Sequence, residues 1–261
     1  MKKTALLIVA ILTFTLLASQ SLAYTSWTQV NTSGFGDSND FWAVELEIYN
    51  GKLYAGTYND VDGTRIFEYS GLGTTWTQIN ADGFGDPNNL GNYSMAVNDN
   101  KLYAGTYNPS TGAEVWEYDG TSWTQVNDDA FGNPIGDNTC TIFSMVSFNG
   151  KLYAGIYFWL TGHRVMEYSG SGTSWTQVNL DSFDGRAGYY MGMQLAVHNN
   201  ELYAVVGNLT TGLGVWKYSG TSPTWTQVND DAFGTANNTE SFGTTIYNGE
   251  FLVGTQTTPA V

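Results

Sequence analysis

One five-residue phrase, Trp-Thr-Gln-Val-Asn, returns along the chain at a nearly constant interval. It occupies 27–31, 76–80 (with Ile79 in place of Val), 123–127, 175–179 and 225–229, so successive tryptophans lie 49, 47, 52 and 50 residues apart. A second phrase, Leu-Tyr-Ala-Gly, keeps the same interval at 53–56, 102–105 and 152–155, with altered copies at 202–205 and 251–254. Self-similarity at a period of about 50 residues is the signature of a repeat architecture.

The N-terminal segment has the pattern of an export signal. Lys2 and Lys3 precede an apolar stretch over 5–18, and Ser21 and Ala23 place small residues at a cleavage site. We expect cleavage after Ala23, so that 1–23 is a signal peptide and 24–261 folds as one secreted, periplasmic or cell-surface domain. A single membrane anchor is the alternative, but the apolar stretch is shorter than the ~20 residues that span a bilayer.

The charge balance is strongly acidic. The chain has 24 acidic and 9 basic residues, and loss of two leader lysines would change its net charge from −15 to −17. Such a surface argues against nucleic acid and anionic membranes as partners. Because Cys140 is the only cysteine, no disulfide can form within the chain, and stability must come from packing.

The second repeat shows how one unit is built. We expect short strands at 93–97, 101–107, 113–118 and 122–127, separated by turns. Three other repeats place an Asn-Gly pair between the first two strands, at 50–51, 149–150 and 248–249, and this dipeptide is a strong hairpin signal. Four short antiparallel strands in about 50 residues correspond to one blade of a β-propeller.

Counting repeats predicts an all-β fold, a five-bladed β-propeller. The expected blades are approximately 41–80, 92–127, 141–179, 191–229, and 241–261 completed by 27–31. In this arrangement the N-terminal strand closes the ring as the outer strand of the last blade. Only six residues follow Thr255, so the last blade is expected to be incomplete; either 257–261 supplies a short third strand or the chain is a piece of a longer protein.

Two short patterns resemble known propeller families. Gly172, Ser174 and Trp175 match the Asp-box turn of sialidase-like propellers, although Gly170 stands in place of the aspartate. The Leu-Tyr-x-Gly phrase followed by a tyrosine and a tryptophan is similar to kelch repeats. Five blades of this size also resemble the tachylectins, which bind sugars. These resemblances cover 27–255 and imply a propeller; the sialidase likeness would imply glycoside hydrolysis with three arginines holding a carboxylate.

The most informative positions are those where one repeat departs from the others. The loop at 158–160 is Phe-Trp-Leu, whereas the second repeat has Asn-Pro-Ser there. Exposed aromatic rings are enriched in binding sites and can stack on sugars. Together with aromatics expected on the same face, they form the predicted ligand-binding set: Trp42, Tyr58, Tyr107, Phe158, Trp159, Tyr189 and Tyr190. The alternative is that these rings fold over the blade tops as structural residues.

Other recurring or charged residues have structural explanations. Each loop between blades carries an aspartate and a phenylalanine; we expect the aspartate to cap the turn and the phenylalanine to pack between blades. Asp60 and Asp62 are a weak candidate for calcium, with a plain turn favoured, and no cofactor is expected. His163 is expected in a loop. Strand positions expected near the axis carry small residues such as Ser94 and Ser144, whereas the first repeat has Glu45 and Glu47.

These observations favour an exported, non-catalytic binding or interaction module, with carbohydrate as the first expected ligand. A protein–protein scaffold at the cell surface is the alternative, and a sialidase-like glycoside hydrolase is the third. The chain has only three arginines, Arg65, Arg164 and Arg186, and nothing in their spacing brings them together. We expect a glycan or extracellular protein partner and a monomer, unless the incomplete blade pairs with another chain.

Overall fold

The computed structural model describes residues 27–133, 139–185, 189–235 and 237–257. The signal-peptide prediction lies outside these residues. Every long element is a β-strand, and the short helical segments are single 3-10 turns between units. Among the described residues, no helix is long and apolar enough to cross a membrane.

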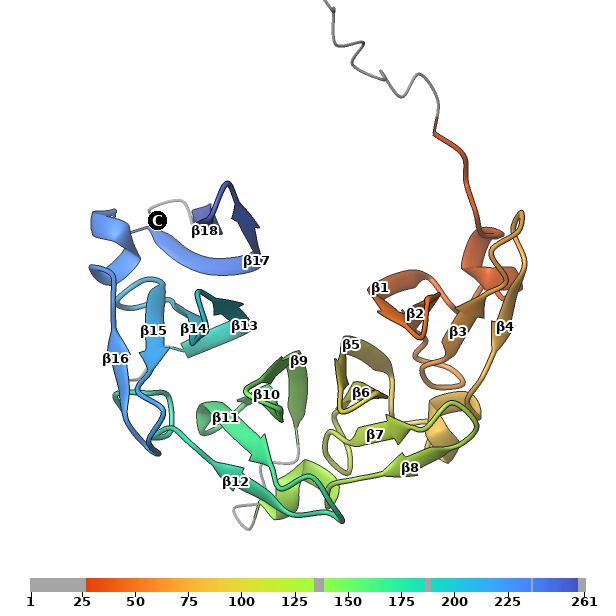
Figure 1. Cartoon of the computed structure of the whole chain (residues 1–261), viewed down its shortest axis with the longest axis horizontal. Helices are drawn as coiled ribbons and strands as arrows, with labels where there is room; N and C mark the ends of the chain where they lie inside the picture. The colour runs from red at the N-terminus through yellow and green to blue at the C-terminus, as the bar shows by residue number, and fades with distance from the viewer. Residues whose placement is uncertain (1–26, 134–138, 186–188, 236, 258–261) are drawn as a thin grey trace, which may run out of the picture.

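Four units of four antiparallel strands follow one another in an arc, and we call each unit a blade (Figure 1). Blade 1 consists of β1 (Trp42–Tyr49), β2 (Lys52–Tyr58), β3 (Ile66–Tyr69) and β4 (Trp76–Gln78). Blade 2 consists of β5 (Gly91–Asn98), β6 (Lys101–Asn108), β7 (Val115–Tyr118) and β8 (Trp123–Gln125). Blade 3 consists of β9 (Cys140–Phe148), β10 (Lys151–Phe158), β11 (Gly162–Tyr168) and β12 (Trp175–Gln177). Blade 4 consists of β13 (Tyr189–His198), β14 (Glu201–Asn208), β15 (Gly214–Tyr218) and β16 (Trp225–Gln227).

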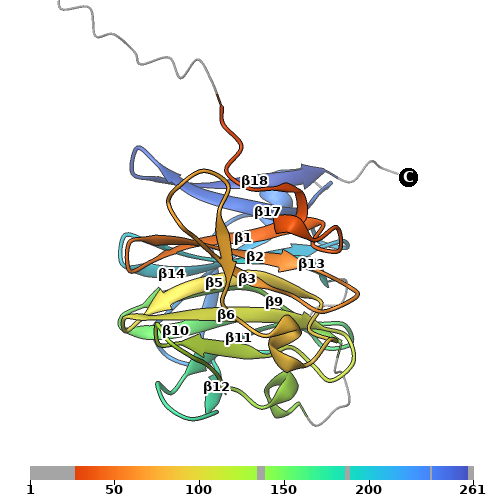
Figure 2. The ribbon, with the colours of Figure 1, turned by 90° about the vertical axis from the view of Figure 1, so that its right-hand side faces the viewer.

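The last unit is the hairpin of β17 (Asn238–Tyr247) and β18 (Glu250–Thr257), which we call blade 5. In every blade the first strand lies on the inside of the arc, and in the four complete blades the fourth strand lies on the outside (Figure 1). The inner strands run across the arc from one end face to the other (Figure 2). The four-strand unit expected from the repeat is therefore present in blades 1 to 4.

The predicted closure of the ring by 27–31 is not found among the described residues. This segment forms no strand, the strands of blade 5 pair only with each other, and blade 5 is separated from blade 1 by a gap (Figure 1). The segment still follows the repeat, because the indole Nε1 of Trp76 donates a hydrogen bond to the carbonyl of Val30. Residues 27–31 thus lie beside blade 1 and do not complete blade 5.

The glycine of Leu-Tyr-Ala-Gly lies at a close contact between adjacent blades. A Cβ atom at Gly105 would lie 2.6 Å from Cγ2 of Ile142 in blade 3, and one at Gly155 would lie 3.0 Å from Sδ of Met193 in blade 4. Any larger side chain would therefore push the inner strand of the next blade outward. The phrase recurs because each blade must leave room for its neighbour.

The loops between blades carry the phenylalanine at a position that packs into the next blade, as predicted. In the turn Asp82–Gly85 (η2), Phe84 stacks on Trp116 of blade 2 with ring centroids 4.8 Å apart. Asp82 does not cap the turn; its carboxylate accepts a hydrogen bond from the side chain of Gln78. The same aspartate–glutamine pair recurs after blades 2, 3 and 4, so the Gln of the repeated phrase fixes the loop that follows it.

The core is divided into apolar clusters between successive blades. The two ends of the arc expose positions that are buried inside it. Leu46 of blade 1 pairs in register with Ala55, as Met95 pairs with Ala104 in blade 2, yet Leu46 is 59% exposed and Met95 only 3%. Blade 1 has no preceding blade among the described residues, and its packing face is open.

Candidate ligand-binding site

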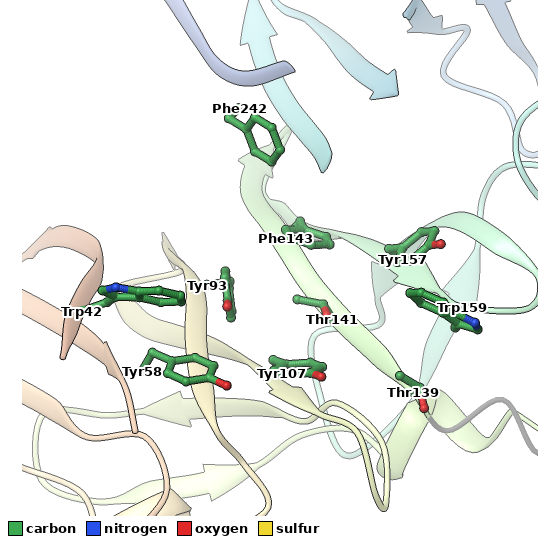
Figure 3. A pocket seen from close by; sticks show the side chains of 10 residues that line it. All are labelled: Trp42, Tyr58, Tyr93, Tyr107, Thr139, Thr141, Phe143, Tyr157, Trp159 and Phe242. Atoms are coloured by element: carbon green, nitrogen blue, oxygen red, sulfur yellow. The ribbon is translucent and has the colours of Figure 1, made fainter. Parts of the chain in front are cut away.

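A hollow of about 410 Å³ lies at the end face where the first strand of each blade begins and the second strand ends (Figure 3). We call it the aromatic hollow, since eight of its ten lining residues are aromatic. The lining consists of Trp42, Tyr58, Tyr93, Tyr107, Thr139, Thr141, Phe143, Tyr157, Trp159 and Phe242. Its mouth is formed in part by Trp42 and Trp159, which are 56% and 61% exposed.

Three of the tyrosines come from one position of the repeat. Tyr58, Tyr107 and Tyr157 each lie at the end of the second strand of a blade. At this level neighbouring blades pair with each other, Tyr58 with Gly91 and Tyr107 with Thr141. The pairing fixes Tyr58 and Tyr107 at junctions between blades, and blades 1 to 3 together supply one aromatic wall.

A β-bulge in the inner strand adds a second layer of rings. The register shifts between Asn92 and Ser94, leaving Tyr93 as the extra residue, and Phe143 occupies the same position in blade 3. A bulge redirects the side chain of its extra residue. The Tyr93 ring lies 6.4 Å from that of Tyr58 and 5.8 Å from that of Phe143, centroid to centroid.

Sequence reasoning missed these bulge residues. Tyr93, Phe143 and Phe242 each come directly before the small residue of the inner strand, at Ser94, Ser144 and Gly243. That spacing is visible in the sequence, but strict alternation along a strand would not place these rings at the end face. The bulge could be recognised only from the strand pairing.

Four of the seven residues predicted to bind a ligand lie together in the structure, and one lies in the core. Trp42, Tyr58, Tyr107 and Trp159 all line the aromatic hollow. The prediction that Phe158 is an exposed loop residue is wrong, because Phe158 is the last residue of β10 and is fully buried. The Arg164 guanidinium lies over its ring, 4.7 Å from the centroid. The strand continues one residue further than expected, and the alternation of side chains points Phe158 into the core.

Tyr189 and Tyr190 belong to β13. Their side chains lie outside what the structure describes. Their predicted role in binding stays a prediction.

A second hollow of about 380 Å³ adjoins the first and is lined by residues of the inner strands. We call it the inner hollow; its lining shares Tyr93, Phe143 and Phe242 with the aromatic hollow and adds Val44, Glu45, Ser94, Met95, Ser144, Met145 and Gln194. Glu45 pairs in register with Gly56, as Ser94 does with Gly105, so it occupies the small-residue position of the repeat.

Two groups in these hollows have shifted acidity. Burial, and then the negative charge of Glu47 on the same face of β1, raise the pKa of Glu45 to about 7, while a backbone hydrogen bond from Met95 acts in the opposite direction. Burial raises the pKa of Tyr93 to about 12. Tyr93 therefore keeps its hydroxyl proton at neutral pH, whereas Glu45 exchanges its proton near neutrality.

The candidate calcium residue Asp62 is engaged by an arginine. Its carboxylate accepts hydrogen bonds from Arg65 and Asn39, and the preceding turn is held by Asn59, whose side-chain oxygen accepts the backbone N–H groups of 61 and 62. Four aspartates surround the Arg65 guanidinium, namely Asp37, Asp40, Asp62 and Asp82. No cluster of three metal-binding side chains occurs among the described residues. Asp60 and Asp62 thus form a turn in which Arg65 supplies the positive charge beside Asp62.

Arg164 and His163 are also held within the fold. Arg164 occupies the position equivalent to Arg65 in β11 and pairs with Asp181 of its own blade. Arg186 lies outside the described residues. His163 was expected in a loop, but it lies in β11, fully buried, with its ring 5.1 Å from that of Tyr157.

No family model matches the chain, and no curated protein matches it in sequence. Among solved structures, the Trypanosoma rangeli sialidase aligns with a TM-score of 0.55 at 13% identity, over 82% of this chain and 43% of the sialidase. The SapL1 lectin, solved in complex with alpha methyl fucoside, aligns with a TM-score of 0.54 at 12% identity, over 82% of both chains. The fold is a β-propeller. This propeller spans less than half the length of the sialidase.

Identities of 12–13% establish the fold alone. They support the sialidase-like architecture expected from the sequence. The Asp-box, kelch and tachylectin details and the count of five blades stay predictions.

Proposed function

We propose that this propeller is a non-catalytic module that binds carbohydrate in the aromatic hollow. The observation that carries the proposal is the pair of exposed indoles, Trp42 and Trp159, at a hollow walled by four tyrosines. Flat aromatic faces stack on the apolar faces of sugar rings, and hydroxyl groups at the same wall can fix a sugar's orientation. Tyr93, Thr139 and Thr141 supply such hydroxyls.

The distribution of charge supports binding over catalysis. The described lining of the aromatic hollow contains no charged side chain. Arg65 and Arg164 are held by aspartates of their own part of the fold, so neither is available to a substrate carboxylate. That a lectin with the same fold was solved with a methyl fucoside is consistent with a sugar ligand. The export signal expected at 1–23 supports this proposal, because glycans and extracellular proteins are available outside the cytoplasm.

A glycan array followed by calorimetry tests the proposal. Trp42→Ala and Trp159→Ala are each expected to weaken binding to the best glycan at least about tenfold, since each removes an exposed stacking surface. Trp27→Ala is the matched control, because Trp27 is 98% exposed and does not line the hollow. Absence of binding to any glycan, or unchanged affinity in both hollow variants, would reject the proposal.

A protein–protein scaffold at the cell surface is the second candidate, and the open ends of the arc favour it. Leu46 and Ile48 of blade 1 are 59% and 66% exposed, and Tyr247 and Leu252 of blade 5 are 65% and 41% exposed. Exposed apolar faces of this kind mark protein interaction sites. A partner, or a second copy of this chain, would bury them.

A further inference from the structure

We infer that the sugar recognised by this propeller carries a free amino group, and that the Glu45 carboxylate receives it. The inference rests on the proposed carbohydrate-binding function and specifies its ligand class. It follows from the position of one carboxylate beneath an aromatic wall.

Glu45 is within reach of a ligand that stacks at the mouth. It follows Trp42 by three residues along β1, which corresponds to about 10 Å at 3.3 Å per residue. The aromatic and inner hollows share Tyr93, Phe143 and Phe242 in their linings, so the hollow that contains Glu45 adjoins the one that contains Trp42. An oligosaccharide with one ring on the indoles can extend a following unit toward the carboxylate.

No other repeat has a carboxylate at the position of Glu45. Ser94, Ser144, Gln194 and Gly243 occupy its position in blades 2 to 5. It is the one charged side chain among the described residues that line the two hollows, and none of the described ion pairs involves it. A partly buried carboxylate without a counter-charge opposes folding, which is consistent with a counter-charge that arrives with the ligand.

The surroundings of Glu45 favour a cation in the same place. Faces of tyrosine and tryptophan rings attract an ammonium group, and Tyr93 lies in the wall of both hollows. Glu47, two residues further along β1, adds negative charge, and the whole chain carries −15. The same negative charge repels sugars that carry a carboxylate, such as sialic acids.

The test compares two oligosaccharides that differ only in their amino groups. A glucosamine tetramer and its N-acetylated counterpart are titrated into the folded protein by calorimetry, in a neutral buffer of low ionic strength. We expect the glucosamine tetramer to bind at least about tenfold more tightly, the range for a hydrogen bond to a charged group. Glu45→Gln should abolish this preference, while Glu47→Gln, which changes a carboxylate outside the lining, should retain it.

The outcomes separate the inference from the function on which it rests. If both oligomers bind with equal affinity, or if Glu45→Gln retains the preference, the amino-sugar assignment is overturned and carbohydrate binding stands. If neither oligomer nor any other glycan binds, both are overturned. Thermal unfolding of each variant confirms that a lost preference does not result from a lost fold.

Discussion

The indole Nε1–H of Trp76 donates a hydrogen bond of 2.7 Å to the backbone carbonyl of Val30, 46 residues earlier in the chain. The contact recurs from Trp123 to Ile79, from Trp175 to Val126 and from Trp225 to Val178. From the second copy onward, the tryptophan of the repeated phrase thus donates a hydrogen bond to the fourth residue of the preceding copy. These hydrogen bonds connect each copy of the phrase to the copy before it.

Replacing a tryptophan within this series should destabilise the fold. Trp225→Phe removes the N–H donor to the Val178 carbonyl, and Trp225 is only 9% exposed. We expect the free energy of unfolding to fall by about 1–3 kcal/mol. Trp27→Phe should change stability by less than about 0.5 kcal/mol, because this side chain is 98% exposed. Urea unfolding measures both; equal effects would contradict the role assigned to the hydrogen bond.

The glycine of Leu-Tyr-Ala-Gly offers a test of blade packing within one chain. Gly105→Ala places a Cβ atom 2.6 Å from Ile142, and overpacking of this kind costs about 1–3 kcal/mol. Gly254→Ala alters the same position in blade 5, where the nearest atom would be 3.5 Å away, so little change is expected. Gly105→Ala should therefore unfold at a clearly lower temperature than Gly254→Ala. A large loss in Gly254→Ala would point to a further blade covering that face.

Arg65 should be far more important to stability than its repeat equivalent Arg164. The side chain of Asp40 is fully buried, and Arg65→Met removes its counter-charge. We expect the free energy of unfolding to fall by about 3–5 kcal/mol. Arg164→Met breaks a pair with Asp181, which is 49% exposed, and should cost about 1 kcal/mol. Denaturant unfolding at neutral pH compares them, and similar losses would refute the ranking.

The effect of Arg65→Met should shrink in acid. Hydrogen bonding from Arg65 lowers the pKa of Asp82 below its ordinary value of 3.8. The stabilisation is therefore present above that value and lost as the pH falls through the lower folded-state pKa. The difference in unfolding free energy between the wild type and the variant should become smaller below pH ~3.8; a constant difference would contradict this origin.

Glu45 should give the opposite pH dependence. Its pKa is raised from 4.5 to about 7 in the folded state, so its contribution to stability is present below pH 4.5 and is lost as the pH rises through 7. We expect Glu45→Gln to match the wild type in acid and to exceed its stability by about 1–3 kcal/mol near pH ~8. Glu201→Gln is the control with the reverse sign, because Tyr203 and Lys217 lower the pKa of Glu201.

The open ends of the arc should cause head-to-tail self-association. The exposed face of blade 1, with Leu46 and Ile48, is equivalent to faces that pack on a preceding blade, and the exposed face of blade 5 is of the opposite kind. Such complementary faces form heterologous contacts. Sedimentation velocity should show assembly that rises with concentration and is reduced by Ile48→Lys, but not by Val61→Lys, a residue 60% exposed in a loop. Monodisperse behaviour at all concentrations would reject this.

The repeat predicted the four-strand blade, the position of each tryptophan and the packing role of Phe84, because these depend on a local pattern copied at a fixed interval. It also pointed to Trp42, Tyr58, Tyr107 and Trp159 as aromatics of one end face. It failed at Phe158, where one additional residue of strand turned a presumed loop ring into a core residue. It failed at Tyr93 as well, because a bulge depends on how two strands pair.

The sequence by itself determined an all-β repeat of about 50 residues with the Trp-Thr-Gln-Val-Asn phrase on each outer strand. Only the tertiary structure decided that three tyrosines, 49 and 50 residues apart, form one wall with Tyr93 and Phe143, and that Glu45 lies beneath it. The physical reason is that periodicity fixes which residues are equivalent, whereas register shifts and the arc of the blades fix which of them meet. The repeated phrase specifies the spacing of the blades, and the site arises where the copies differ.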